Sequence, residues 1–268
     1  MLPDVENEPK RSRARGGAPI RVSTGRVLAI ALAFSVLLIA SIYVFHRLEQ
    51  FLIRDPRFAL AGVDADPAAL EIAGAAHASR AQIERVFAID LGRSVYLLPL
   101  SDRRETLRAV DWVKDASIAR LWPNRVVISI HERKPVAFVT LGPARFGLID
   151  EDGVILPPAP DRFTLPVLTG VRASDSLEAR RDRVHRMLRL TLDLGDNVRN
   201  ISEVDVSDRD NLKVTVPRDG HIMTLLLGDR NYAQRYQNFL SYYSKIKHSL
   251  PNAATLDLRL DDRITAVE

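Results

Sequence analysis

The sequence predicts an α+β protein with a single transmembrane helix, a small β-α-α-β-β domain and an antiparallel β domain with two helices packed on one face. Three observations support this prediction. An uncharged run covers residues 27–45. Two amphipathic helical segments, followed by two β-like runs joined by a turn, lie between residues 68 and 134. From residue 135 onward, short β runs separated by turn signals alternate with two further helical segments.

The uncharged run, residues 27–45, would form a helix of roughly 28 Å, about the thickness of the hydrocarbon core of a bilayer. A buried helix of a soluble protein rarely stays uncharged on every side over such a length. A cleaved signal peptide usually has a shorter apolar region of ~7–15 residues, followed by a small-residue cleavage site. Six Lys or Arg residues precede position 27 against three acidic residues, so we expect an uncleaved anchor with a cytoplasmic N-terminus.

The composition excludes several classes of function. The chain has 268 residues, of which 46% are hydrophobic and 27% charged, as is typical of a folded protein. Residues 1–26 are expected to be a disordered basic cytoplasmic tail. Because the rest of the chain is nearly balanced in charge, we expect no nucleic-acid partner. Cysteine is absent, which excludes disulfides, a thiol nucleophile and cysteine-ligated zinc.

Residues 46–67 are expected to be a juxtamembrane linker and residues 68–134 the small domain. A short strand at 69–74 precedes two helices, for which Ser79 and Ser101 are candidate N-caps. Alternating apolar residues then predict two strands, 113–121 and 125–132.

Three residues around this hairpin are predicted to be structural. Pro123 fixes its own φ at the turn and pushes Trp122 into an extended conformation, so that Trp122 should cap the end of the hairpin. Pro135 should end the final strand, because proline cannot donate to a continuing ladder. It would then mark the hinge into the second domain, residues 135–268.

The second domain is expected to be a mostly antiparallel sheet with both helices on one face. Asp152-Gly153 is a hairpin signal between two of its β runs. The first helix should present an apolar stripe of Val184, Met187, Leu188 and Leu192. The second helix, residues 229–247, places five residues at core spacing: Tyr232, Tyr236, Phe239, Leu240 and Tyr243.

A search for catalytic patterns finds none that is complete. His131-Glu132 lacks the second histidine of a zinc-protease motif, and an exposed strand histidine is the better interpretation. Residues 150–153 resemble part of a calcium loop but lack the later ligands. Neither a nucleophile elbow nor a phosphate loop occurs. We therefore expect a protein that is not an enzyme and needs no cofactor or metal.

The order of these features resembles the FtsQ/DivIB family of bacterial cell division proteins, in which the small unit is a POTRA domain. The two most specific matches are Arg120-Leu121-Trp122-Pro123 and Glu132-Arg133-Lys134-Pro135-Val136-Ala137. Weaker matches extend through much of the chain: Ile72 with Gly74, Trp112-Val113, Leu148-Ile149-Asp150, Leu165-Pro166, and Asp257-Leu258-Arg259.

The resemblance implies a scaffold of the divisome, with its N-terminus in the cytoplasm and its other domains in the periplasm, anchored by residues 27–45 in the inner membrane at the division septum. It implies that the last strands bind the FtsB partner of the FtsB–FtsL coiled coil, which links the protein to septal wall synthesis, and that the POTRA domain meets upstream division proteins. Carried over by position, the partner-binding residues are Arg259, Leu260, Arg263, Ile264, Ala266 and Val267.

Alternatives remain open at this point. The final hairpin, residues 256–267, would be an open sheet edge that accepts a partner's strand, or an edge guarded by the charges of Asp261, Asp262 and Arg263. As a whole, the chain could instead be a POTRA-bearing envelope transport or assembly factor, although no repeated POTRA unit is visible. A membrane-tethered wall enzyme would need converging carboxylates or a metal.

Overall fold

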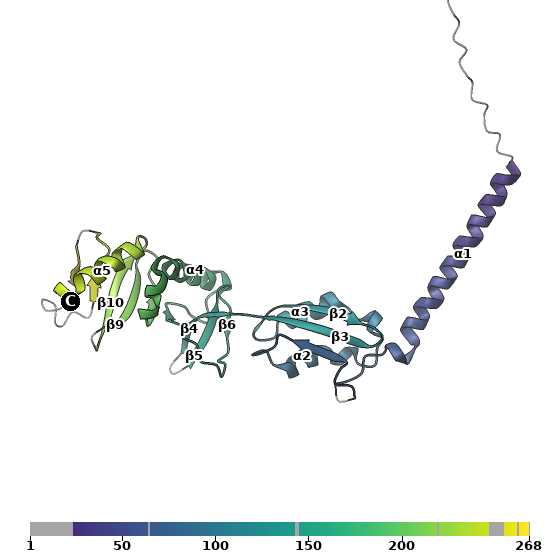
Figure 1. Ribbon diagram of the computed structural model, residues 1–268, viewed down its shortest axis with the longest axis horizontal. Helices are drawn as coiled ribbons and strands as arrows, with labels where there is room; N and C mark the ends of the chain where they lie inside the picture. The colour runs from purple at the N-terminus through teal and green to yellow at the C-terminus, as the bar shows by residue number, and fades with distance from the viewer. Residues whose placement is uncertain are drawn as a thin grey trace, which may run out of the picture. The chain divides into compact units, whose positions relative to one another are not determined.

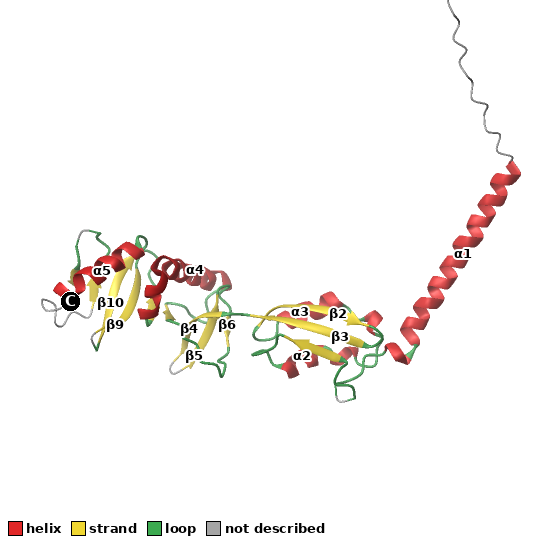
Figure 2. Cartoon of the chain, viewed as in Figure 1, coloured by secondary structure: helices red, strands yellow, loops and turns green. Residues whose placement is uncertain are grey.

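The computed structural model describes residues 24–63, 65–142, 145–218, 220–246, 255–261 and 263–267. The chain divides after Asp55 into two compact units. The first contains helix α1, and the second contains two β-sheets with their helices (Figure 1; Figure 2). Most of the tail expected at residues 1–26 lies outside the described residues.

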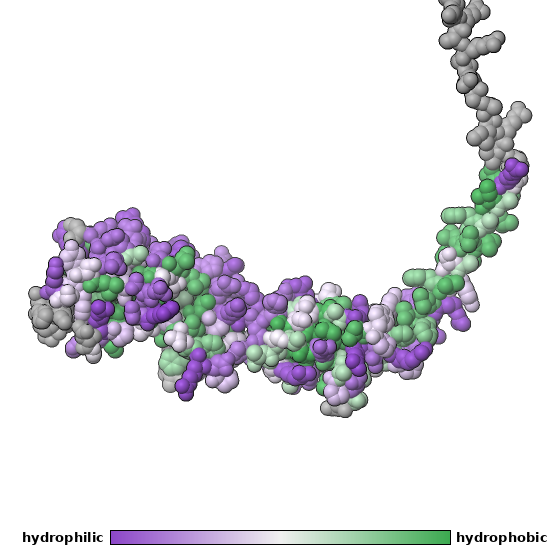
Figure 3. Space-filling model, viewed as in Figure 1, coloured by the Kyte–Doolittle hydropathy of each residue, from purple (hydrophilic) through white to green (hydrophobic). Residues whose placement is uncertain are grey.

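Helix α1 (Thr24–Arg54) contains the predicted anchor and continues beyond it. None of its residues is buried, and apolar residues cover much of its surface in Figure 3. Among the described residues, it is the one helix that is long and apolar enough to cross a membrane.

The small sheet has the strand order β1-β3-β2. The elements follow the predicted β-α-α-β-β order: β1 (Leu70–Ala73), α2 (Arg80–Val86), α3 (Leu100–Arg108), β2 (Val113–Leu121) and β3 (Arg125–Glu132). β1 is parallel to β3, and β2 is antiparallel to β3. Three short 3-10 helices lie around these elements: η1 (Pro56–Phe58), η2 (Ala88–Asp90) and η3 (Val95–Leu97).

One of the two predicted helix caps of this domain is confirmed. The Ser79 hydroxyl accepts a hydrogen bond from the Gln82 N–H and begins α2. The prediction for Ser101 is wrong, because α3 begins at Leu100 with Pro99 as its N-cap residue, and Ser101 lies inside the first turn. Proline suits this position because a helix start needs no N–H from it.

Within the described residues, the large sheet has nine strands in the order β12-β11-β10-β9-β8-β7-β4-β5-β6. Pairs β4–β7, β7–β8 and β10–β11 are parallel and the other pairs are antiparallel. In chain order the elements are β4 (Pro135–Gly142), β5 (Arg145–Asp150), β6 (Ile155–Leu156), β7 (Val167–Thr169), α4 (Leu177–Leu194), η4 (Gly195–Asn200), β8 (Glu203–Asp205), β9 (Leu212–Arg218), β10 (His221–Gly228), α5 (Tyr232–Ile246), β11 (Thr255–Asp257) and β12 (Thr265–Val267).

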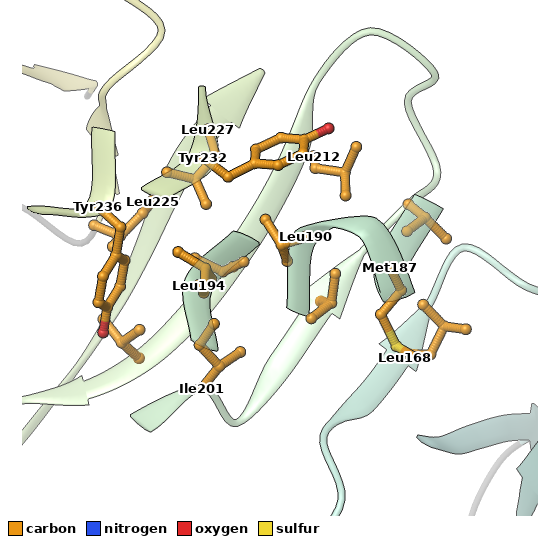
Figure 4. Packing of buried hydrophobic residues seen from close by; sticks show 14 of the residues in the cluster. Leu168, Met187, Leu190, Leu194, Ile201, Leu212, Leu225, Leu227, Tyr232 and Tyr236 are labelled. Carbon is orange, nitrogen blue, oxygen red and sulfur yellow. The ribbon is translucent and has the colours of Figure 1, made fainter. Parts of the chain in front are cut away.

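Helices α4 and α5 pack on one face of this sheet, as predicted (Figure 1), and their apolar side chains share one core with the strands (Figure 4). Tyr232, Tyr236, Phe239 and Tyr243 are buried, as the spacing in α5 predicted. One expectation for α4 is wrong: Leu192 is 82% exposed. The buried stripe runs instead through Val184, Met187, Leu190 and Leu194, because two residues after Leu190 the helix has turned about 200° away from the core.

The two sheets meet around His77. Its Nδ1 lies 2.8 Å from Glu132 Oε2, and its Nε2 lies 2.8 Å from Asp161 Oδ2, in the segment between β6 and β7. The ring stacks on the buried Trp112 at a centroid distance of 4.5 Å. Nearby, Arg133 Nη1 donates to Asp150 Oδ2 at 2.6 Å. The boundary between the domains is therefore tied by charged hydrogen bonds.

Candidate functional site

The outermost strand of the large sheet is β12. It pairs antiparallel with β11, where Thr255 faces Val267 and Leu256 faces Ala266. No other described strand pairs with its second side. All three β12 residues are exposed, and Val267 is 43% exposed. An edge of this kind presents backbone donors and acceptors to a partner strand.

The strand that supports this edge is firmly seated. Leu256 and Leu258 are buried in the core that α4 and α5 cover. The Leu258 N–H donates to the Leu226 carbonyl at 3.0 Å, which continues the parallel pairing of β11 with β10. The backbone groups of β12 are therefore exposed on a strand whose neighbour, β11, is held in place by the core.

Helix α5 holds the loop that joins β11 to β12. Arg235 is almost fully buried, and its Nε donates to Asp261 Oδ1 at 2.9 Å while its Nη1 donates to the Leu227 carbonyl at 2.7 Å. Asn238 Nδ2 also donates to the Asp261 carbonyl, at 3.3 Å. The hydrogen bond from Arg235 lowers the pKa of Asp261, so the carboxylate remains charged and the loop remains tied at neutral pH.

Between α5 and this loop lies a pocket of about 500 Å³. Polar and apolar groups both line it: Gln234, Arg235, Asn238, Tyr242, Leu258, Leu260, Asp261, Arg263 and Ile264. Leu260 is 53% exposed, whereas Ile264 packs against the core. A partner strand on β12 would therefore find next to it a pocket that can take a side chain or a helix end.

The six predicted partner-binding residues occupy this region. Leu260, Arg263 and Ile264 line the pocket, and Ala266 and Val267 lie on β12. Arg259 is paired within the chain: its Nη2 donates to Asp257 Oδ2 at 2.6 Å, and this pairing lowers the pKa of Asp257. An acidic partner residue would have to share the guanidinium with Asp257.

Helix α5 contributes to this site through residues that the sequence alone did not predict there. Gln234, Asn238 and Tyr242 follow one another at a spacing of four residues, on a different side of the helix from its buried aromatic residues. That polar stripe was visible in the sequence, but only the fold shows that it lies against the terminal loop. Asp261, considered above as an edge guard, is tied to α5, and Asp262 lies outside the described residues.

The predicted structural residues lie at the two ends of β3. Trp122 is 50% exposed, and its ring packs edge-on against Phe58 at a centroid distance of 5.6 Å. Trp122-Pro123 is a cis peptide. β3 ends at Glu132, and Pro135 is the first residue of β4 rather than the last of β3. His131 is exposed, as expected.

In the part of the chain that the structure describes, no group of three or more His, Asp or Glu side chains is placed to hold a metal ion. An exposed edge strand beside a pocket is an arrangement through which proteins bind other chains.

These features define a class of protein: a membrane-anchored chain whose POTRA-type domain leads to a sheet with an exposed edge. Residues 67–133 match the family model "POTRA domain, FtsQ-type", and residues 137–259 match "Cell division protein FtsQ/DivIB, C-terminal". The chain belongs to the FtsQ/DivIB family of cell division proteins.

Named relatives agree with the two family models. Cell division protein FtsQ of Koribacter versatilis is 30% identical over 257 residues, 93% of this chain and 72% of the relative. The protein of that name from Caulobacter vibrioides is 28% identical over 209 residues, 69% of this chain and 68% of the relative. The protein of that name from Novosphingobium aromaticivorans is 31% identical over 199 residues, which are 73% of this chain and 59% of the relative.

Proposed function

We propose that this chain is a non-catalytic scaffold of the divisome that binds the FtsB–FtsL coiled coil through the β12 edge and so links upstream division proteins to septal wall synthesis. The exposed β12 strand, backed by a buried strand and flanked by the α5 pocket, is the observation that carries this proposal. An FtsB strand would add to β12, and a side chain of the same segment would enter the pocket.

The proposal also includes an orientation. The excess of Lys and Arg before position 27 supports a cytoplasmic N-terminus. Residues 56–268 would then lie in the periplasm, where partners with a single membrane helix present their own extracytoplasmic segments. The POTRA domain would meet upstream division proteins, and we assign no residue to that contact. We place the complex in the inner membrane, at the septum.

Substitution of exposed apolar residues near the edge strand by glutamate tests the proposal. Leu260→Glu and Val267→Glu change two exposed apolar side chains on either side of the proposed contact. Each should weaken copurification of full-length FtsB–FtsL with the full-length chain from membranes by about tenfold or more, because a buried, unpaired carboxylate costs several kcal/mol. In cells depleted of the native copy, both variants should fail to restore division.

Leu192→Glu is the matched control, since Leu192 is also an exposed leucine of the same domain but lies on α4. It should bind FtsB–FtsL and support division like the unmodified chain. If the edge variants bind as well as this control, β12 is not the contact. If cells depleted of the native copy divide normally without any copy of the chain, the scaffold function itself is wrong.

A further inference from the structure

Exposed apolar side chains gather at the end of the small sheet where β2 turns into β3. Leu121 and Trp122 are 46% and 50% exposed, although both are large and apolar. Leu97, at the end of η3, is 41% exposed. Arg120 brings η3 beside the end of β2, because its Nε and Nη2 donate to the Val95 and Leu98 carbonyls at 2.7 and 2.6 Å. We call residues 56–60, 94–98 and 119–126 the β2–β3 tip.

The charge of the tip has one sign. The side chains of the tip that are charged at neutral pH are Arg57, Arg120 and Arg125, all exposed, and its three segments contain no Asp or Glu. Arg125 faces Leu121 across the β2–β3 pairing. An aromatic side chain, exposed leucines and several arginines on one surface are the combination that suits the interface of an anionic bilayer, where Trp sits at headgroup level and Arg meets phosphate.

The chain itself keeps the tip close to a membrane. Phe58 comes four residues after the end of α1, and its ring lies 5.6 Å from that of Trp122. The four residues from Asp55 to Phe58 span at most ~14 Å. When the lengths of the Phe58 and Trp122 side chains are added, the indole of Trp122 stays within about 25 Å of Arg54, whatever the angle between the two units. α1 extends nine residues past the apolar run 27–45, about 14 Å along its axis. The indole can therefore reach the interface from which α1 emerges.

We propose that the β2–β3 tip docks on the anionic interface of the membrane that anchors the chain, with Trp122 and Leu121 among the headgroups and Arg125 facing lipid phosphates. This contact goes beyond the proposed scaffold function and does not depend on it. It would limit the angles that the POTRA domain can adopt above the membrane. A protein partner on the same patch would need no lipid, and this difference is what the test uses.

The absence of cysteine permits a direct test with a single spin label. The full-length chain carrying Leu121→Cys is reconstituted, without other proteins, into phosphatidylcholine bilayers with and without phosphatidylglycerol. Collisions of the label with oxygen, which is concentrated in lipid, are compared with collisions with a water-soluble nickel complex. The matched control is His131→Cys, an exposed position at the far end of β3.

The expected result is an oxygen-to-nickel ratio several-fold higher at position 121 than at position 131, and higher with phosphatidylglycerol than without it. Arg125→Glu should reduce the ratio at position 121. In the unlabelled chain, lipids brominated near the headgroups should quench tryptophan emission, and Trp122→Phe should remove most of that quenching because Trp112 is buried. Equal ratios at positions 121 and 131, together with unquenched emission, would overturn the proposal.

Discussion

Arg235 of α5 joins Asp261 of the terminal loop through a 2.9 Å hydrogen bond from Nε to Oδ1. The same guanidinium donates through Nη1 to the Leu227 carbonyl at the end of β10. One buried cation therefore fixes the helix, the strand β10 and the loop that leads into β12. The position of the exposed edge depends on this connection.

Arg235→Met should loosen the β11–β12 hairpin. It leaves the buried Leu227 carbonyl without this donor, which costs about 1–3 kcal/mol of folding free energy. Asp261→Asn should cost less, since Asp261 is 55% exposed at its side chain and the ion pair is screened by solvent. Amide hydrogen exchange in residues 255–267 of the full chain should accelerate more in Arg235→Met. Exchange in Arg235→Met that equals that of the unmodified chain would show that Arg235 does not hold the loop.

A pair of leucines on α4 tests the corrected packing. Leu190 is fully buried and Leu192 points to solvent. Leu190→Ala should cost about 2–5 kcal/mol through lost burial and a cavity, whereas Leu192→Ala should stay within about 0.5 kcal/mol of the unmodified chain. Pulse proteolysis of the full chain in urea measures both. Similar losses at the two positions would contradict the orientation of α4.

Alanine substitutions at two glycines with positive φ distinguish the cost of backbone strain from the cost of a steric clash. Gly92 has φ +75° and open space where a Cβ would lie, whereas a Cβ at Gly74 (φ +79°) would overlap the Ile130 carbonyl oxygen of β3. Gly92→Ala should cost ~1–2 kcal/mol, the strain of a left-handed alanine. Gly74→Ala should cost distinctly more, because β3 cannot retreat from β1 without weakening their pairing. Equal melting temperatures for the two variants would contradict this.

The contact around His77 should make stability depend on pH. Hydrogen bonds from His77 to Glu132 and then Asp161 raise the pKa of the imidazole. A raised folded-state pKa means that the stabilisation is complete below the unfolded value of about 6.5 and is lost as pH rises through the folded value. Burial opposes ionisation of Glu132, but hydrogen bonds from the Ala78 N–H and His77 outweigh it and lower its pKa. Its contribution to stability is therefore complete above the unfolded pKa of a glutamate and is lost as the pH falls through the lower folded pKa.

His77→Gln should therefore reduce the melting temperature of the full chain most at mildly acidic pH and least at alkaline pH. His131→Gln, on the exposed face of β3, is the control and should show no such trend. A difference between His77→Gln and the unmodified chain that does not vary with pH would rule out an ionised His77 at the domain boundary.

Local patterns in the sequence predicted most of the architecture, because each depends on neighbouring residues. The aromatic spacing in α5 predicted its buried face, and the two alternating runs before and after Trp122 predicted the β2–β3 hairpin. Strand pairing was harder to predict. The parallel pair of β7 with β8 depends on how α4 crosses the sheet, and the parallel pair of β7 with β4 depends on the path of the chain through β5 and β6. Period-two alternation contains no such information.

The site was predicted only in part, for the same reason. The edge residues 259–267 are consecutive, so the resemblance to a family could identify them as a group. The Arg235 connection joins residues 26 positions apart, and His77 meets Asp161 across 84 positions. Contacts between residues so far apart in the sequence follow from the fold, and the spacing of neighbouring residues contains no information about them.

The most direct test of the proposed binding edge is amide hydrogen exchange of the full-length chain, with and without full-length FtsB–FtsL. Our account predicts slowed exchange at β12, residues 265–267, because its outward N–H groups would bond to the added strand. β6, residues 155–156, is the opposite edge of the same sheet and should be unaffected. Protection confined to β6, or a stable complex that leaves β12 exchange unchanged, would contradict the central claim.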